Sequence, residues 1–170
     1  MGAGKTAVGK ALAARLAVPF LDSDHEIIKA ASASIADIFA RDGEEFFRAR
    51  ETEVITRLLH AKPGVLSTGG GAYLAAHNRQ RISESGVAVW LQADLDLLWQ
   101  RVRHKNTRPL LRTDNPRKTL AELYKARDPL YALADLRVAC HADYSIEDMA
   151  QAVIGVLRTR PDVLEIDQDG

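Results

Sequence analysis

Short apolar stretches alternate with segments of helical character along the chain, and this alternation restricts the possible fold more than any other feature. The apolar stretches that predict strands are VPFLDSD (18–24), GVLSTGGG (64–71), GVAVWLQA (86–93) and LRVAC (136–140). The segments that predict helices cover residues 4–17, 34–41, 44–59, 77–85, 94–104, 115–135 and 145–159. Strands that are buried on both faces and alternate with helices are typical of parallel sheets. The sequence therefore predicts an α/β fold with a parallel sheet.

Two of the predicted helices have recognisable start signals. Ser34 with Asp37, and Ser145 with Asp148, have the spacing of a capping box, so we expect a helix to begin after each serine. Gly43 is expected to end the first of these helices.

In parallel sheets the ligand lies beyond the carboxyl ends of the strands, where this chain has glycine-rich and acidic segments.

The composition limits the class of protein. The 170 residues are 46% hydrophobic and 27% charged, which is sufficient for one globular domain with its own core. Lys+Arg and Asp+Glu both number 23, and no apolar run reaches the roughly 18 residues of a membrane span. We therefore expect neither a nucleic-acid nor a membrane partner. The single cysteine, Cys140, is expected to be a buried thiol of a cytoplasmic protein, and the five histidines lack the spacing of zinc ligands.

The segment GAGKT (2–6) has the residues of a phosphate-binding loop. Glycines allow backbone N–H groups to turn toward phosphate oxygens, and a following helix N-terminus favours negative charge. In this interpretation Lys5 reaches the β- and γ-phosphates, and the Thr6 hydroxyl ligates Mg²⁺. The alternative is a run of small residues that begins a helix without binding anything.

Two aspartates, Asp22 and Asp24, follow the first predicted strand. If the chain stays extended there, both carboxylates point to the same side. One can then serve Mg²⁺ through water, while the other accepts a proton from a substrate hydroxyl. The alternative is a strand-to-helix turn in which Asp24 caps the helix.

Glycines and arginines supply the remaining candidates. The three glycines of TGGG (68–71) permit close approach of the backbone to a ligand, and the alternative is a flexible turn. Arg48, Arg108 and Arg127 each adjoin apolar residues. Arginine suits two-point recognition of carboxylate or phosphate, so convergence of the three would indicate an anionic substrate. The alternative is that each is an ordinary surface side chain.

Together these segments resemble the shikimate kinases, small P-loop enzymes that use ATP to phosphorylate the 3-hydroxyl of shikimate in chorismate and aromatic amino acid biosynthesis. The matching segments occur in that family's order and are GAGKT (2–6), DSDHEI (22–27), IADIFARDGEEFFRARE (35–51), VLSTGGG (65–71), RPLL (108–111) and RDPLY (127–131). The resemblance implies a three-layer α/β/α P-loop kinase fold with a five-stranded parallel sheet, of which this chain contains four recognisable strands. It also implies one domain over 1–158, with a substrate-binding subdomain at about 24–55 and a lid at about 104–115, and then an acidic tail at 159–170.

The resemblance assigns roles to individual residues. The ATP-binding set is Gly2, Ala3, Gly4, Lys5, Thr6, Ala7, Arg101 and Arg108. The shikimate-binding set is Asp24, Phe39, Phe47, Arg48, Gly69, Gly70, Gly71 and Arg127. The Mg²⁺ set is Thr6 and, through water, Asp22, with Ser67 near the metal, and the catalytic set is Lys5, Asp24 as base, and Arg108. ATP and shikimate are the expected partners of a monomer.

Two other functions stay open on the sequence alone. One is a kinase of the same fold that acts on gluconate or a nucleoside monophosphate, against which TGGG and the two carboxylate-type arginines argue. The other is a nucleotide-binding or scaffold protein without catalysis. Five intact candidate residues argue against it, namely Lys5, Thr6, Asp22, Asp24 and Arg48. The full phosphate-loop pattern would place its first glycine two positions before Met1. We therefore expect the natural protein to begin about ten residues earlier, with the strand that precedes such a loop, and Met1 to be an internal methionine of the loop.

Overall fold

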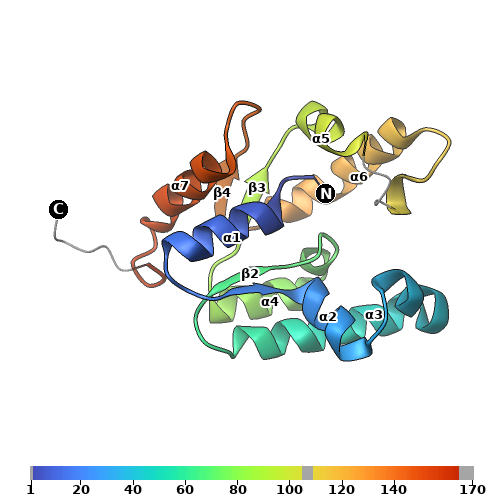
Figure 1. Ribbon diagram of the computed structural model, residues 1–170, viewed down its shortest axis with the longest axis horizontal. Helices are drawn as coiled ribbons and strands as arrows, with labels where there is room; N and C mark the ends of the chain where they lie inside the picture. Colours follow the sequence, from blue (N-terminus) through green and yellow to red (C-terminus); the bar gives the residue numbers. More distant parts are fainter. Residues whose placement is uncertain (1, 105–108, 165–170) are drawn as a thin grey trace. The chain divides into compact units, whose positions relative to one another are not determined.

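The computed structural model describes residues 2–104 and 109–164, and Figure 1 shows the elements in chain order, from α1 in blue to α7 in red. The helices are α1 (Lys5–Arg15), α2 (Ser23–Ala31), α3 (Ile35–Leu59), α4 (Ala76–Ser85), α5 (Leu95–Val102), α6 (Pro116–Tyr131) and α7 (Ile146–Leu157). The strands are β1 (Phe20–Asp22), β2 (Val65–Ser67), β3 (Val89–Gln92) and β4 (Leu136–Ala139), and two short 3-10 turns are η1 (Ala72–Leu74) and η2 (Pro109–Leu111). The predicted α/β alternation is confirmed, whereas neither 3-10 turn was predicted.

The strands form two parallel pairs. In one pair β1 lies beside β2, with Asp22 opposite Ser67, and in the other β3 lies beside β4, with Gln92 opposite Ala139. The predicted parallel pairing is confirmed for these four strands. The expectation that the strands are buried on both faces is wrong, because among their residues only Ser67 and Val138 are buried. Within the part of the chain that the structure describes, each of these strands has one hydrogen-bonded neighbour, so one edge of each strand is not covered by a second strand.

The contacts between residues divide the chain into two units. Unit 1 comprises the residues up to Val8 and those from Val87 onward, and unit 2 comprises Gly9–Gly86. The boundary falls within α1. The buried apolar side chains of unit 1 include Leu97, Leu98, Val102, Leu120, Val138, Met149, Val153 and Leu157. In unit 2, Ile27, Ile38 and Phe47 form a cluster that Ile35, Phe39 and Val54 partly cover. The segment predicted as a substrate-binding subdomain, at about 24–55, lies within unit 2, and its role in substrate binding stays a prediction.

The predicted helix starts are confirmed. Ser34 Oγ accepts a hydrogen bond from Asp37 N at 3.1 Å and caps α3. Ser145 and Asp148 form the full capping box of α7, in which Ser145 N donates to Asp148 Oδ2 at 2.9 Å and Asp148 N donates to Ser145 Oγ at 3.1 Å. Within the described ranges, no helix has both the length and the apolar character that crossing a membrane requires.

Gly43 interrupts α3 at the predicted position. Its backbone has φ 84° and ψ 172°, which separates a first segment at 35–42 from a second at 44–59. Side chains other than hydrogen are strongly disfavoured in that region of backbone space. Gly43 thus sets the direction in which the second segment, which carries Phe47 and Arg48, leaves the first.

We expect Gly43→Ala to lower the free energy of unfolding by about 1–3 kcal/mol, because the backbone of an alanine is strained at this positive φ. Gly155→Ala is the matched control, since a methyl group there meets no atom within 4 Å and Gly155 lies inside α7. That control should stabilise the chain by about 0.5–1 kcal/mol. Denaturant unfolding of both variants measures the difference, and equal effects would contradict the strain at Gly43.

Candidate active site

The glycine-rich start of the chain leads directly into α1 in unit 1. Gly2 and Gly4 have positive φ values of 79° and 86°, and α1 begins at Lys5. A methyl group at Gly2 would lie 2.8 Å from a side-chain carbon of Val102, so the backbone approaches α5 closely there. The first turn of α1 carries no acidic residue. The helix N-terminus therefore presents N–H groups and partial positive charge to an anion without a competing carboxylate in that turn.

Arg101 of α5 lies against this loop. Its Nη1 atom is 3.5 Å from Gly2 O and 3.4 Å from Ala3 O. Arg101 also contacts Cys140, which is buried as predicted, and burial raises the pKa of the Cys140 thiol while Arg101 opposes that shift. The structure thus brings Arg101 to the loop, whereas the predicted Arg108 lies outside the described residues.

The two predicted aspartates do not share an extended strand. The strand β1 ends at Asp22 and α2 begins at Ser23, so the expectation of two carboxylates on one strand face is wrong. Asp22 rather than Asp24 caps α2, because its Oδ1 accepts hydrogen bonds from Asp24 N at 3.0 Å and His25 N at 3.2 Å. These bonds hold Asp24 in the first turn of α2. Asp24 is therefore positioned by the capped start of a helix.

The TGGG glycines approach side chains of the protein itself. A methyl group at Gly69 would lie 2.9 Å from Asp24 Oδ1 and 3.2 Å from Glu51 Oε1. A methyl group at Gly71 would lie 2.5 Å from both Nη1 and Nη2 of Arg48. Neither glycine has a positive φ, so a larger residue there would be opposed by the close side chains of Asp24, Glu51 and Arg48, which would have to move, and not by backbone strain. Gly69 N also donates a hydrogen bond to Ser23 Oγ at 3.3 Å.

Other predicted substrate residues gather around the same glycines in unit 2. Arg48 Nη1 forms an ion pair with Glu51 Oε2 at 2.7 Å, and its guanidinium lies 5.2 Å from the centre of the Phe47 ring. The rings of Phe39 and Phe47 are 4.6 Å apart between centroids. Unit 2 therefore combines two carboxylates, a guanidinium and two aromatic rings, which is a set suited to a small polar molecule. Arg127 lies on α6, which belongs to unit 1, and is half-buried.

Glu51 is a site residue that the sequence predictions missed. Its side chain is 1% exposed, and Oε1 has no hydrogen-bond partner among the described residues. Burial raises the pKa of the Glu51 carboxyl, the ion pair with Arg48 opposes that shift, and Asp24 adds to it. The signal in the sequence was an acid four residues from Phe47 and four from Ile55, which places a carboxylate on an otherwise apolar helix face.

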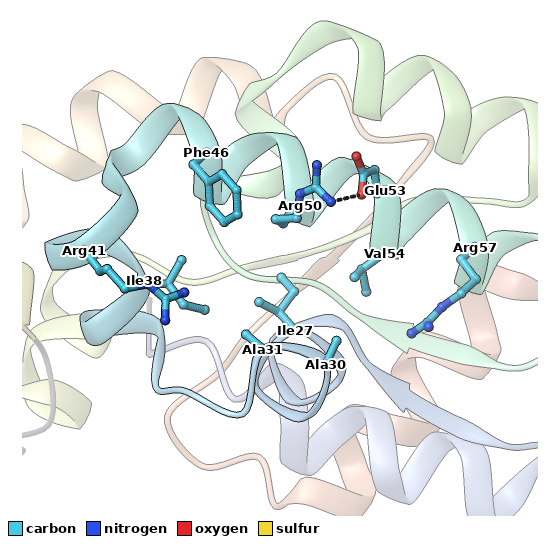
Figure 2. Close-up of a pocket in the computed structure, with 10 residues that line it drawn as sticks. All are labelled: Ile27, Ala30, Ala31, Ile38, Arg41, Phe46, Arg50, Glu53, Val54 and Arg57. Carbon is cyan, nitrogen blue, oxygen red and sulfur yellow. Dashed lines mark ion pairs between the residues drawn. The ribbon is translucent and has the colours of Figure 1, made fainter.

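A groove of about 420 Å³ between α2 and α3 lies on another face of α3 (Figure 2). Its lining is Ile27, Ala30, Ala31, Ile38, Arg41, Phe46, Arg50, Glu53, Val54 and Arg57. None of these is a predicted site residue. Arg50 and Arg57 already form ion pairs at 2.9 Å with Glu53 and Glu26. The groove therefore lacks the buried acid and the close glycines that distinguish the other face.

The fold and the two sets of residues define a class of protein. Parallel strands alternate with helices, and a glycine loop with Lys5 and Thr6 opens the first helix, which is the arrangement of a P-loop nucleotide-binding kinase.

Comparisons with known proteins identify the family. The shikimate kinase family model matches residues 1–158. A shikimate kinase of Ruegeria pomeroyi is 66% identical over 166 residues, which are 98% of this chain and 85% of that protein, and one of Cereibacter sphaeroides is 64% identical over 99% of this chain and 84% of that protein. The solved structure of Acinetobacter baumannii shikimate kinase in complex with shikimate is 41% identical, with a TM-score of 0.86 over 97% of this chain and 91% of that one. The chain belongs to the shikimate kinase family.

We expect Glu51→Gln to weaken shikimate binding without destabilising the chain at neutral pH. The amide cannot pair with the Arg48 guanidinium as a charge, so the shikimate KM should rise about tenfold while the ATP KM changes little. Steady-state kinetics with each substrate varied in turn measures this. Asp96→Asn is the control, because that carboxylate is exposed and pairs with Arg117 on the surface of unit 1.

The difference in stability between the Glu51→Gln variant and the natural chain should also depend on pH. The pKa of Glu51 is raised above its ordinary value of 4.5, so the folded state binds a proton more readily than the unfolded state. The contribution of Glu51 to stability is therefore present at low pH and is lost as pH rises through the folded-state pKa. The stability of Glu51→Gln relative to the natural residue should increase from pH 4.5 to pH 8 in denaturant unfolding. A difference that decreases over that range would contradict the role of burial.

Proposed function

We propose that this shikimate kinase transfers the γ-phosphoryl group of ATP to the 3-hydroxyl of shikimate with Lys5, Asp24 and Arg108 as its catalytic residues. The observation that carries the proposal is the cluster of Asp24, Arg48 and Glu51 around the TGGG glycines in a member of this family. Phosphoryl transfer needs positioning and charge stabilisation more than covalent chemistry, so these roles suffice for catalysis.

On the donor side, we assign the ATP phosphates to Gly2, Ala3, Gly4, Lys5, Thr6 and Ala7. The positive φ values of Gly2 and Gly4 and the acid-free start of α1 support this assignment. Lys5 supplies positive charge to the β- and γ-phosphate oxygens. Arg101, which contacts the loop carbonyls, is assigned to the nucleotide as well, and Arg108 to the transferring phosphate.

Mg²⁺ is the proposed metal, with Thr6 as a direct ligand and Asp22 as a ligand through water. Hydroxyl and carboxylate oxygens are the donors that Mg²⁺ prefers. Asp22 caps α2 through Oδ1, and a carboxylate can accept further bonds through its second oxygen. Over residues 2–104 and 109–164, no three His, Cys, Asp or Glu side chains group as metal ligands. We assign the other coordination positions of the Mg²⁺ to phosphate oxygens and water, and the metal would supply positive charge to the phosphates.

On the acceptor side, we assign Asp24 as the base that accepts the proton of the reacting hydroxyl. Arg48 and Arg127 are assigned to the shikimate carboxylate, and the backbone of Gly69–Gly71 and the rings of Phe39 and Phe47 to the shikimate ring. Contacts within unit 2, from Arg48 to Gly71 and from Phe39 to Phe47, support the assignments of these residues, and the assignment of Arg127 rests on the family resemblance. We further propose that the enzyme acts as a cytoplasmic monomer.

We expect Asp24→Asn to lower kcat by about 10² or more, since the amide cannot accept the hydroxyl proton. A coupled assay of ADP release measures kcat, and calorimetric titration shows whether shikimate still binds. Near-normal turnover would remove Asp24 as the base. Loss of shikimate binding alone, with kcat unchanged at saturation, would reduce Asp24 to a binding residue.

Arg127→Ala and Arg48→Ala should each raise the shikimate KM far more than the ATP KM, because both remove a charged partner of the substrate carboxylate. Arg117→Ala on α6 and Arg50→Ala on α3 are the matched controls, since both arginines pair with surface acids. Equal increases in both KM values would refute a carboxylate clamp.

A further inference from the structure

The first turn of α4 holds the segment that follows the TGGG glycines. Asn78 is 1% exposed, and its Nδ2 donates a hydrogen bond of 3.0 Å to Ala72 O. The next residue, Arg79, donates from Nη1 to Tyr73 O at 2.9 Å and to Leu74 O at 2.7 Å. Two consecutive side chains of α4 therefore bind all three carbonyls of η1.

The turn η1 in turn holds the glycines. Ala72 N donates to Gly69 O at 3.1 Å, and Leu74 N donates to Gly71 O at 3.1 Å. A chain of hydrogen bonds thus runs from Asn78 and Arg79 through η1 to two of the glycines that approach Asp24, Glu51 and Arg48. Glycine loses more backbone freedom on ordering than any other residue, so a run of three glycines needs support from its surroundings.

The buried Asn78 side chain destabilises the chain locally, which indicates that its hydrogen bond to Ala72 O does more than fill space. Asn78 Oδ1 is buried and has no hydrogen-bond partner among the described residues. An unpaired buried acceptor destabilises a protein, whereas an apolar side chain of the same shape would fill the space without that cost. A chain with an apolar residue at position 78 would lose the hydrogen bond from Nδ2 to Ala72 O.

We propose that Asn78 and Arg79 are positioning residues for shikimate binding, which fix the TGGG glycines through the carbonyls of η1. Ser23 Oγ, which accepts a hydrogen bond from Gly69 N, fixes the other end of the loop. The proposal rests on the assignment of Gly69–Gly71 to the acceptor site, and it adds two residues that do not touch the substrate.

The test compares Asn78→Leu with the natural chain. The variant removes the unpaired Oδ1 but also leaves Ala72 O without its donor, so the two effects on stability oppose each other and thermal unfolding should show only a small change. Calorimetric titration should show a shikimate Kd raised about tenfold, with the ATP Kd within about twofold. Hydrogen exchange at the Ala72 and Leu74 amides should accelerate about tenfold, because the turn is released. Gln80→Leu is the control, since Gln80 is exposed on α4 and its Nε2 donates to Glu84 Oε1 at 2.8 Å.

A second variant protects the test against misfolding of the first. Arg79→Lys keeps the charge but cannot hold two carbonyls in the same way, so it should also weaken shikimate selectively. Shikimate binding within twofold of the natural chain in both variants would overturn the proposal, as would equal weakening of ATP and shikimate with lower stability. Arg48→Ala distinguishes failure of the positioning role from failure of the acceptor site. If it weakens shikimate binding while both α4 variants do not, only the positioning role fails. If Arg48→Ala is also without effect, the acceptor site itself is wrong.

Discussion

The ion pair between Arg48 and Glu51 is the interaction on which the acceptor side of unit 2 depends. A carboxylate that is 1% exposed needs a charged partner, and Arg48 Nη1 supplies it at 2.7 Å. The pairing holds the guanidinium close to the Gly71 backbone and the carboxylate beside Gly69 and Asp24. A side chain at Gly69 or Gly71 would therefore displace the charged groups that this ion pair positions.

Over residues 2–104 and 109–164, two buried side chains have an oxygen without a hydrogen-bond partner, and both belong to unit 2. Glu51 has a raised pKa and an unpaired Oε1, and Asn78 has an unpaired Oδ1. Neither is a favourable way to fill a core. Each is explained if the position of a neighbouring group, the guanidinium in one case and the η1 carbonyls in the other, matters more than local stability.

Local signals predicted the elements well. Ser34, Gly43 and Ser145 mark helix boundaries through bonds and backbone angles that span a few residues, so the sequence contains the whole cause. The prediction of an extended strand over Asp22 and Asp24 was wrong. The same three residues can also begin a helix, and in the structure Asp22 caps that helix. Strand burial was also wrong, since it depends on how many neighbours a strand has and not on its own residues.

The sequence by itself determined the class of fold and the family, because those depend on residue type and on short spacing, while the phosphate loop and the acceptor residues stay predictions. Only the tertiary structure decided which side chains meet. In the sequence, Glu51 and Asn78 look like ordinary helix residues. In the structure, α3 places Glu51 beside the glycines and α4 places Asn78 beside η1. Contacts between distant segments arise from packing, and the reason for a buried carboxylate or amide becomes visible only when its partner is in place.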